Sequence, residues 1–195
     1  LSLEGYTINP SDKKYPKLKL SDIEGIKFTT ITAKTNLDKL GTFVSIDTET
    51  TGLIPSQSEV IEVAAVYFDH WIPTRKFEIL LKPKKNIPEK IQSLTGITDD
   101  MVQNSPSFFQ VIPCLEDFVG KSNIVGHNLH FDLKFLYKNG YNFFSQKRKY
   151  YDTLELARKI LKGPSKKWDK ELESYEIDYD KYFDVDNHKL DTLCK

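Results

Sequence analysis

Short runs rich in β-branched and aromatic residues follow one another in the first half of the chain and predict β-strands. The runs lie at residues 42–46, 60–68 and 76–81, with short polar connections between them. Because short connections join neighbouring strands of opposite direction, we expect an antiparallel meander. A fourth apolar run, at residues 123–125, ends in a turn and predicts another buried strand.

Two segments of the second half show helical features. Residues 106–118 place three apolar side chains on one helix face, those of Val111, Leu115 and Phe118. A later segment has Asp152 as its N-cap and Glu155 three residues on, the pattern of a capping box, and Gly163-Pro164 ends it. Strands and helices in this order predict an α/β fold with a mixed sheet.

A third helix is predicted at residues 129–139, directly after the fourth strand. Asn128 is a suitable N-cap, and Gly140 follows the last turn as a stop signal. Two apolar rows lie side by side on this helix, formed by Leu129, Leu133, Leu136, Phe131 and Phe135. We therefore expect this face to belong to the core.

Two segments lack a regular apolar pattern. Residues 1–41 are polar and lysine-rich, and we expect an extension or an arm that lies on the core; within them, residues 23–31 alternate enough to form a strand. Residues 165–186 shift to charged residues and tyrosine, which indicates a solvated loop inserted between helices. The predicted main domain spans residues 42–195, after the extension over residues 1–41.

Composition narrows the class of protein. The chain has 195 residues with 28 basic and 28 acidic side chains, so no overall field draws it to nucleic acid, and any such contact must be a local groove. The two cysteines, Cys114 and Cys194, are far apart and indicate free thiols in a reducing compartment. No apolar run approaches transmembrane length and no signal peptide is recognisable, so we expect a cytoplasmic location and no membrane contact.

Two acids at the end of the first predicted strand, Asp47 and Glu49, carry the candidate chemistry. Side chains of a strand alternate between its faces, so both carboxylates point the same way and repel each other. A solvated strand end would tolerate such a pair. A divalent cation would stabilise it, and oxygen ligands suit Mg²⁺ or Mn²⁺. The carboxyl end of a buried strand is where open α/β sheets bind ligands, which favours the cation.

A third acid, Asp132, lies in the first turn of the helix at residues 129–139. On its own it would be explained as a negative charge that stabilises a helix N-terminus. Asp132 also lies one turn beyond Asn128, near the end of the fourth strand. We therefore expect Asp47, Glu49 and Asp132 to converge in one open cleft.

Together these residues resemble the first two motifs of the DEDD exonuclease superfamily, in particular its epsilon-like 3′–5′ exonucleases, which include ribonuclease T. The motifs are Asp47-Thr48-Glu49-Thr50-Thr51-Gly52-Leu53 and Gly126-His127-Asn128-Leu129-His130-Phe131-Asp132. Weaker matches at residues 59–66, 94–98 and 151–158 follow the family's order. The resemblance runs from about residue 42 to the C-terminus. It implies a ribonuclease H-like mixed five-stranded sheet flanked by helices.

The third motif of this family, a His followed five residues later by an Asp, has no match. Leu193 stands at that offset from His188. Tyr182 and Asp186 match a tyrosine variant formally, but they lie in an acidic, aromatic stretch, so we interpret the match as chance. Residues 187–195 resemble the helix that precedes the third motif. We therefore expect residues 1–195 alone to be inactive or nearly so.

The resemblance implies hydrolysis of phosphodiester bonds at a two-metal site with Mg²⁺ or Mn²⁺. It implies three catalytic and metal-binding acids, Asp47, Glu49 and Asp132. It implies five residues at the substrate, Thr48, Thr50, Leu53, Asn128 and Phe131, of which Phe131 fits plain core equally well. The implied substrate is a single-stranded 3′ end of DNA or RNA, which loses nucleoside monophosphates in proofreading or repair. A DNA polymerase is the candidate partner, and the oligomeric state is left open.

Two other classes of protein fit the same residues. One is a non-catalytic nucleic-acid-binding module of the same fold. The other is a phosphatase or related metal-dependent hydrolase that uses the same acids on a different phosphoester. Activity on a single-stranded oligonucleotide, compared with a simple phosphate ester, distinguishes them.

Overall fold

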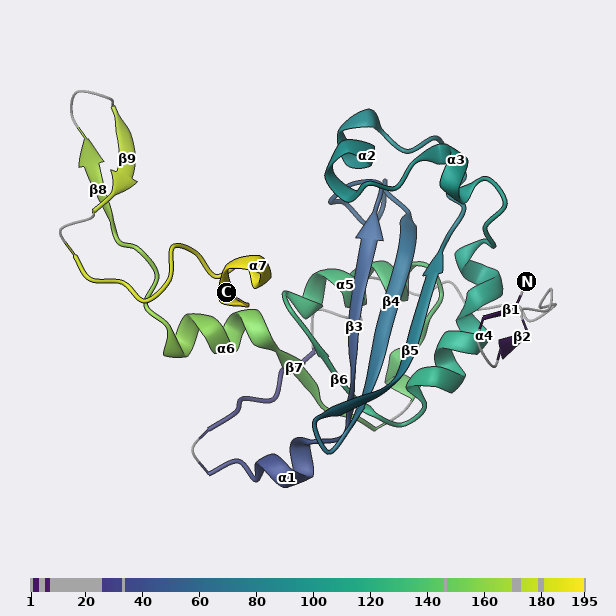
Figure 1. Cartoon of the computed structure of the whole chain (residues 1–195), viewed down its shortest axis with the longest axis horizontal. Helices are drawn as coiled ribbons and strands as arrows, with labels where there is room; N and C mark the ends of the chain where they lie inside the picture. The colour runs from purple at the N-terminus through teal and green to yellow at the C-terminus, as the bar shows by residue number, and fades with distance from the viewer. Residues whose placement is uncertain are drawn as a thin grey trace.

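A mixed five-stranded sheet forms the centre of the computed structural model, which describes residues 2–3, 6–7, 26–32, 34–145, 147–169, 173–178 and 181–194. The strand order is β5-β4-β3-β6-β7 (Figure 1). The strands are β3 (Phe43–Thr50), β4 (Val60–Asp69), β5 (Ile72–Leu80), β6 (Asn123–Gly126) and β7 (Tyr150–Asp152). The first three form the predicted antiparallel meander, and β6 and β7 continue the sheet in parallel. The predicted α/β architecture with a mixed five-stranded sheet is confirmed.

The edge strand beside β6 is β7, and the N-terminal segment supplies no strand to this sheet within its described part. The strand predicted at residues 23–31 is wrong for residues 26–31, and residues 23–25 lie outside the described residues. Thr29 instead donates its N–H to the Tyr150 carbonyl at 2.8 Å, while Ile26 and Phe28 pack against the core. Residues 26–32 therefore lie along β7. Two short strands nearer the N-terminus, β1 (Ser2–Leu3) and β2 (Tyr6–Thr7), pair with each other.

Helices connect and cover the strands. They are α1 (Leu37–Leu40), α2 (Glu89–Thr95), α3 (Asp99–Val102), α4 (Phe108–Val119), α5 (Leu129–Lys138), α6 (Thr153–Ile160), α7 (Leu190–Leu193) and the 3₁₀ helix η2 (Phe143–Ser145). α4 and α5 match their predicted ranges closely. α6 has the predicted Asp152 cap, whose carboxylate accepts the Leu154 N–H at 2.9 Å. No helix in the described part of the chain is long and apolar enough to cross a bilayer.

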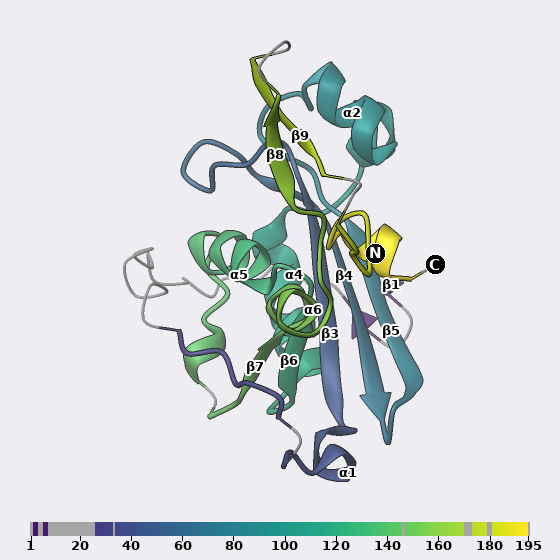
Figure 2. The same ribbon diagram turned by 90° about the vertical axis from the view of Figure 1, so that its left-hand side faces the viewer.

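The main core lies between one face of the sheet and the helices α4 and α5, which Figure 2 shows on one side of β3. Val44 and Ile46 point from β3 into this core. The predicted helix faces are buried there, as the side chains of Val111, Leu115 and Leu133 show. Burial of these apolar side chains fixes which face of β3 is inside. The opposite face of β3 is thereby left for polar side chains.

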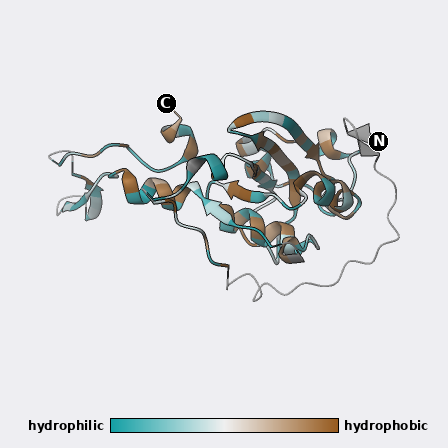
Figure 3. Cartoon of the chain, turned by 90° about the horizontal axis from the view of Figure 1, so that it is seen from below, coloured by the Kyte–Doolittle hydropathy of each residue, from teal (hydrophilic) through white to brown (hydrophobic). Residues whose placement is uncertain are grey.

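The charged segment after α6 forms a hairpin, so the prediction of a solvated loop over residues 165–186 is wrong in part. β8 (Lys166–Asp169) and β9 (Ser174–Ile177) pair antiparallel. Figure 1 shows this hairpin standing away from the central sheet. Figure 3 shows hydrophobic residues gathered in the sheet and its helices, and mainly hydrophilic residues along this C-terminal excursion. Local composition marked the segment as exposed but did not reveal the strand pairing.

Candidate active site

The end of β3 presents two carboxylates on the face of the sheet opposite the core. Burial alternates along the strand: Ile46, Thr48 and Thr50 are buried, whereas Asp47 is exposed and Glu49 half-buried. Asp47 and Glu49 therefore share one face, as a strand with period two requires. In the antiparallel register with β4, Asp47 lies opposite Ala64.

A further acid on this face, Glu62 of β4, was not singled out from the sequence. Glu62 lies directly opposite Glu49 in the register of β3 and β4. Like charges at such a cross-strand position destabilise a sheet. Burial raises the pKa of Glu62, and the charges of Glu78 and Asp47 raise it further. The sequence shows an acid inside an apolar run at this position, but only the strand register places it beside Glu49.

β6 brings the second motif against β3, and a glycine permits the close approach. A Cβ atom at Gly126 would lie 3.0 Å from the Ile46 carbonyl oxygen and 2.8 Å from Leu129 Cδ1. Real Cβ atoms rarely come so near backbone, so a side chain here would push β6 or α5 away from β3. Gly126 therefore keeps the start of α5 next to the end of β3.

The turn between β6 and α5 is fixed to the start of α6. Asn128 has left-handed backbone angles, with φ 60°, and its N–H donates to Asp152 Oδ1 at 3.0 Å. His127 Nδ1 lies 3.1 Å from Thr153 Oγ1, which in turn donates to the Gly126 carbonyl at 3.2 Å. Asn128 occupies the N-cap position, but its side chain makes no capping hydrogen bond, so the predicted side-chain cap is wrong. The side chain is exposed instead.

Asp132 is the buried acid of the site. Its side chain is 3% exposed, and its Oδ1 accepts the Thr48 hydroxyl at 2.7 Å. This hydrogen bond joins the first turn of α5 to β3 across 84 positions of sequence. Asp132 therefore meets the same strand that carries Asp47 and Glu49. The Thr48 side chain is therefore engaged inside the protein.

The remaining predicted substrate residues fall into two groups. Thr50 is buried and donates its hydroxyl to the Gly52 carbonyl at 2.7 Å, so it shapes the turn after β3. Leu53 in that turn is 80% exposed, which leaves it open to an apolar contact. Phe131 is partly buried against the core, and its ring centroid lies 4.9 Å from that of Phe135. The structure thus gives Phe131 a packing role.

The acids perturb one another's ionisation. Burial raises the pKa of Asp132 to about 7; the Thr48 hydrogen bond opposes this shift, and the Asp47 charge adds to it. Burial likewise raises the pKa of Glu49, helped by the charges of Asp47 and Glu62. Packed protein around Asp47 raises its pKa even though the side chain is open to solvent on one side. Each of these shifts would be reversed by a nearby cation.

The donor set has the chemistry of a site for a hard divalent cation, because carboxylate oxygens are the ligands that Mg²⁺ and Mn²⁺ prefer. It is not a preformed cage, since no three His, Cys, Asp or Glu side chains among the described residues are grouped to hold a metal ion. The Thr48 hydrogen bond holds Asp132 in its buried position. Cation binding would relieve the repulsion between Asp47 and Glu49.

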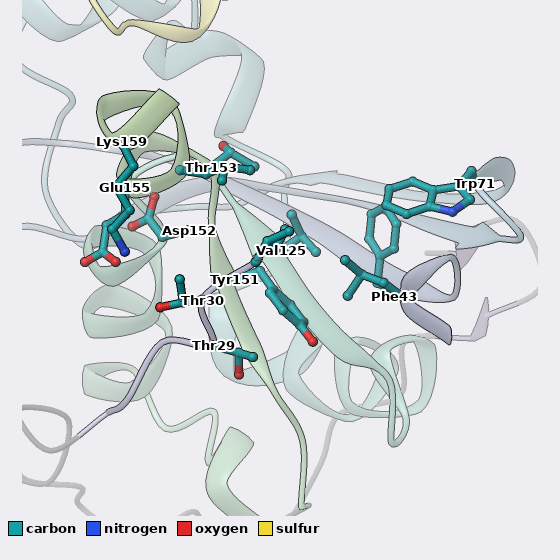
Figure 4. Close-up of a pocket in the computed structure, with 13 residues that line it drawn as sticks. Thr29, Thr30, Phe43, Trp71, Val125, Tyr151, Asp152, Thr153, Glu155 and Lys159 are labelled. Atoms are coloured by element: carbon teal, nitrogen blue, oxygen red, sulfur yellow. The ribbon is translucent and has the colours of Figure 1, made fainter. Parts of the chain in front are cut away.

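An apolar cavity of about 290 Å³ lies against Phe43 (Figure 4). Phe43 stands on the same face of β3 as Asp47, because side chains of a strand alternate. Phe43, Val125 and Tyr151 line it from the sheet, and Trp71 lines it from the turn between β4 and β5. Asp47, Glu49 and Asp132 do not line this cavity. The three carboxylates therefore lie apart from it.

Comparison with known proteins identifies the class to which this chain belongs. The family model described as "Exonuclease" matches residues 44–188, so the chain belongs to the exonuclease family. The resemblance to epsilon-like DEDD exonucleases is thereby confirmed. The chain is 42% identical over 128 residues to the DNA polymerase III subunit epsilon of Aquifex aeolicus, covering 65% of this chain and 63% of that protein.

Two other matches agree with this class. The DNA polymerase III PolC-type of Thermotoga maritima is 38% identical over 139 residues, which cover 70% of this chain and 10% of that protein. The chain thus spans just under two thirds of the first relative and a tenth of the second. A crystal structure of E. coli exonuclease I in complex with a dT13 oligonucleotide matches 61% of this chain and 29% of that one, with a TM-score of 0.54 at 21% identity. This likeness confirms the ribonuclease H-like fold.

The raised pKa of Asp132 predicts a pH-dependent cost of keeping this carboxyl in the fold. The folded-state pKa of about 7 lies above the ordinary value of 3.8, so the folded state holds the proton more tightly. The contribution of the Asp132 carboxyl to the free energy of unfolding is therefore fully present below pH 4. It is lost as pH rises through 7, because the folded state must then carry the buried charge. Asp132→Asn cannot ionise and can still accept the Thr48 hydroxyl. In EDTA at pH 8 we expect this variant to unfold with a free energy roughly 2–4 kcal/mol higher than the unmodified protein.

Urea denaturation at pH 8 and at pH 4 measures this difference, which should shrink toward zero at pH 4. Asp117→Asn is the control, because Asp117 is an exposed acid on α4 and its replacement should leave the pH dependence unchanged. If Asp132→Asn were less stable than the unmodified protein at pH 8, the raised pKa of Asp132 would be contradicted.

Proposed function

We propose that this chain is a metal-dependent 3′–5′ exonuclease domain that releases nucleoside monophosphates from 3′ ends of DNA or RNA. The proposal is supported by the position of Asp47 and Glu49 on one face of β3 and by the hydrogen bond of Asp132 in α5 to Thr48, which lies between them. The pKa of each carboxyl is raised, and the Asp47 charge contributes to the shift of Asp132. Membership of the exonuclease family supports a phosphodiester as the bond that is cut.

Asp47 and Glu49 would hold the cations from the sheet, and Asp132 would contribute from α5. Bound Mg²⁺ or Mn²⁺ would supply an activated water and would stabilise the leaving 3′-oxygen. The chain itself holds the carboxylates in place. The Thr48 hydroxyl fixes Asp132, and the ties of His127 and Asn128 to α6 fix the helix start.

The terminal nucleotide would lie against the turn that follows β3. Leu53 offers an exposed apolar side chain there, suited to contact with a base. The Thr48 and Thr50 side chains are hydrogen-bonded within the protein. Contact with the 3′-hydroxyl would fall to backbone groups at these two positions. Asn128 is exposed at the mouth of the site, whereas Phe131 supports it from the core.

We also propose a role in proofreading or repair beside a DNA polymerase, which is supported by relatives named as DNA polymerase III components. We assign the exonuclease domain to residues 42–195 and treat residues 1–41 as an extension.

A non-catalytic nucleic-acid-binding module of the same fold is the second candidate, favoured by one observation. Tyr182, 75% exposed, donates its hydroxyl to Asp184 at 2.8 Å, and His188 Nε2 lies 2.9 Å from the Leu161 carbonyl. Both side chains are thus hydrogen-bonded within the segment that begins at the end of α6, so we assign neither as the general base.

In the intact protein, Asp47→Ala should abolish release of mononucleotides from a 5′-labelled single-stranded oligonucleotide in Mg²⁺ or Mn²⁺. The change removes a carboxylate that would hold the cations, so we expect a rate lower by roughly a hundredfold or more. EDTA should stop the unmodified enzyme. Asp117→Ala, at an exposed position on α4, is the control and should retain full activity. Near-normal turnover by Asp47→Ala would rule out the two-metal assignment.

Residues 1–195 assayed alone should show little or no hydrolysis. The described residues provide three of the four acids of the family pattern, and the fourth acid and the general base have no match among them. The comparison is a side-by-side assay with a longer form of the protein that carries a His and, five residues on, an Asp. Equal rates for the two forms would contradict this prediction and would require Tyr182 and Asp186 to be reconsidered as the third motif.

A further inference from the structure

The β8–β9 hairpin has two chemically different faces. In its register Trp168 lies opposite Tyr175, and Lys166 lies opposite Ile177. These four side chains share one face, because side chains of a strand alternate. The two rings touch with centroids 5.0 Å apart at 68°, and they remain 50% and 66% exposed. We call these four residues, Lys166, Trp168, Tyr175 and Ile177, the aromatic face.

The charges of the hairpin are sorted between the two faces. The opposite face carries Lys167, Asp169, Ser174 and Glu176, and so it holds the carboxylates of both described strands. Lys167 Nζ lies 3.7 Å from Asp178 Oδ1, whereas Lys166 forms no ion pair with a residue in the described part of the chain. The aromatic face thus combines two exposed rings with one available cation and has no carboxylate on its strands.

The base of the hairpin is fixed to the polypeptide that leaves and re-enters the domain. Asp178 is buried, lies near Lys167 and Lys181, and donates its N–H to the Ser165 carbonyl at 2.8 Å. Asp184 accepts the Lys162 N–H at 2.6 Å. A two-stranded hairpin alone is marginally stable in water. These contacts hold it in place although its aromatic face covers no core.

The hairpin stands at the end of the molecule toward which β3 runs. Figure 1 shows it beyond α6 and level with α2, well to the side of β3, and Figure 2 shows it at the same end of the molecule, in front of the sheet. That end of β3 carries Asp47 and Glu49. A nucleic-acid strand whose terminus lies at these acids could therefore extend to the hairpin side of the domain.

We propose that the aromatic face binds unpaired nucleotides of single-stranded nucleic acid, with bases stacked on Trp168 and Tyr175 and a backbone phosphate at Lys166. Exposed aromatic rings beside a cation are the usual elements of single-strand binding, because each base offers a π-face whatever the sequence. The chain has no net charge, so affinity for nucleic acid has to come from local groups such as these. A protein-docking face is less well matched, since among the paired residues of β8 and β9 only Ile177 adds an aliphatic side chain to this face. The inference rests on the proposed function in taking nucleic acid as the substrate.

Fluorescence anisotropy with a labelled single-stranded oligonucleotide tests the proposal by binding alone. Trp168→Ala and Tyr175→Ala should each weaken binding by about tenfold, because each removes a stacking surface. Trp168→Phe keeps a ring and should restore most of the affinity. Glu176→Ala, on the opposite face of the same hairpin, is the matched control and should change the affinity by less than about twofold. A blunt duplex, which offers no unpaired base, should show little effect of any of these changes.

Lys166→Ala should weaken single-strand binding and reduce the salt dependence of the affinity by about one phosphate contact. Unchanged affinity in both Trp168→Ala and Tyr175→Ala would overturn the proposal, and the aromatic face would then be assigned to a protein partner. An equal loss on the blunt duplex would overturn base stacking.

The result is separable from the proposed function. In the intact protein, Asp47→Ala should keep single-strand binding while it loses hydrolysis, and the hairpin variants should keep hydrolysis of a dinucleotide too short to reach them. If Asp47→Ala hydrolyses normally while Trp168→Ala binds poorly, the proposed catalytic assignment fails and the hairpin inference stands.

Discussion

Asp132 is a buried carboxyl that touches the central strand through the Thr48 hydroxyl, at 2.7 Å. This contact determines how α5 docks on β3, and it requires the close approach of β6 that Gly126 permits. It also places an ionisable group where water is scarce, so the pKa of Asp132 rises to about 7. Without a nearby cation, the Asp132 carboxyl is therefore either protonated or carries a negative charge that destabilises the fold.

The sheet beside Asp132 also carries negative charges in an unfavourable arrangement. Asp47, Glu49 and Glu62 lie on one face, and Glu49 faces Glu62 directly across the strands. A sheet selected for stability alone would replace one of these acids by a neutral or basic residue. Lys76 of β5 pairs with Glu78 of the same strand rather than with the acids of β3. Repulsion between like charges is thus concentrated at the C-terminal end of β3 and at the first turn of α5. An active site that binds a cation requires such a concentration of negative charge.

The sequence predicted those parts of the fold that have a local signature. The meander, α4, α5 and α6 follow from apolar spacing and from Asp152 as a cap, and the motifs around Asp47 and Asp132 led to the correct family. β7 was missed because three residues are too few to show a period. Asn128 was predicted to cap with its side chain, but its left-handed backbone and the Asp152 contact replace that cap.

Other features depend on contacts between distant residues. Glu62 joins the acids only through the register of β3 and β4, and the pKa of Asp132 depends on how deeply α5 packs. The β8–β9 hairpin was hidden in a segment rich in charge, because pairing of Trp168 with Tyr175 leaves no mark on local composition. Tertiary pairing of this kind overrides propensity.

The central claim is that Asp47, Glu49 and Asp132 form one cation site, and NMR titration with Mn²⁺ tests it most directly. Mn²⁺ is paramagnetic and broadens signals of nearby nuclei, so the amide signals of the protein report where it binds, independently of activity. We predict that signals of Asp47, Glu49 and Asp132 broaden first in residues 1–195, and that Asp47→Ala removes this selective broadening. First broadening at the acids of the C-terminal segment, such as Asp184 and Asp186, with the three site acids unaffected, would contradict the account.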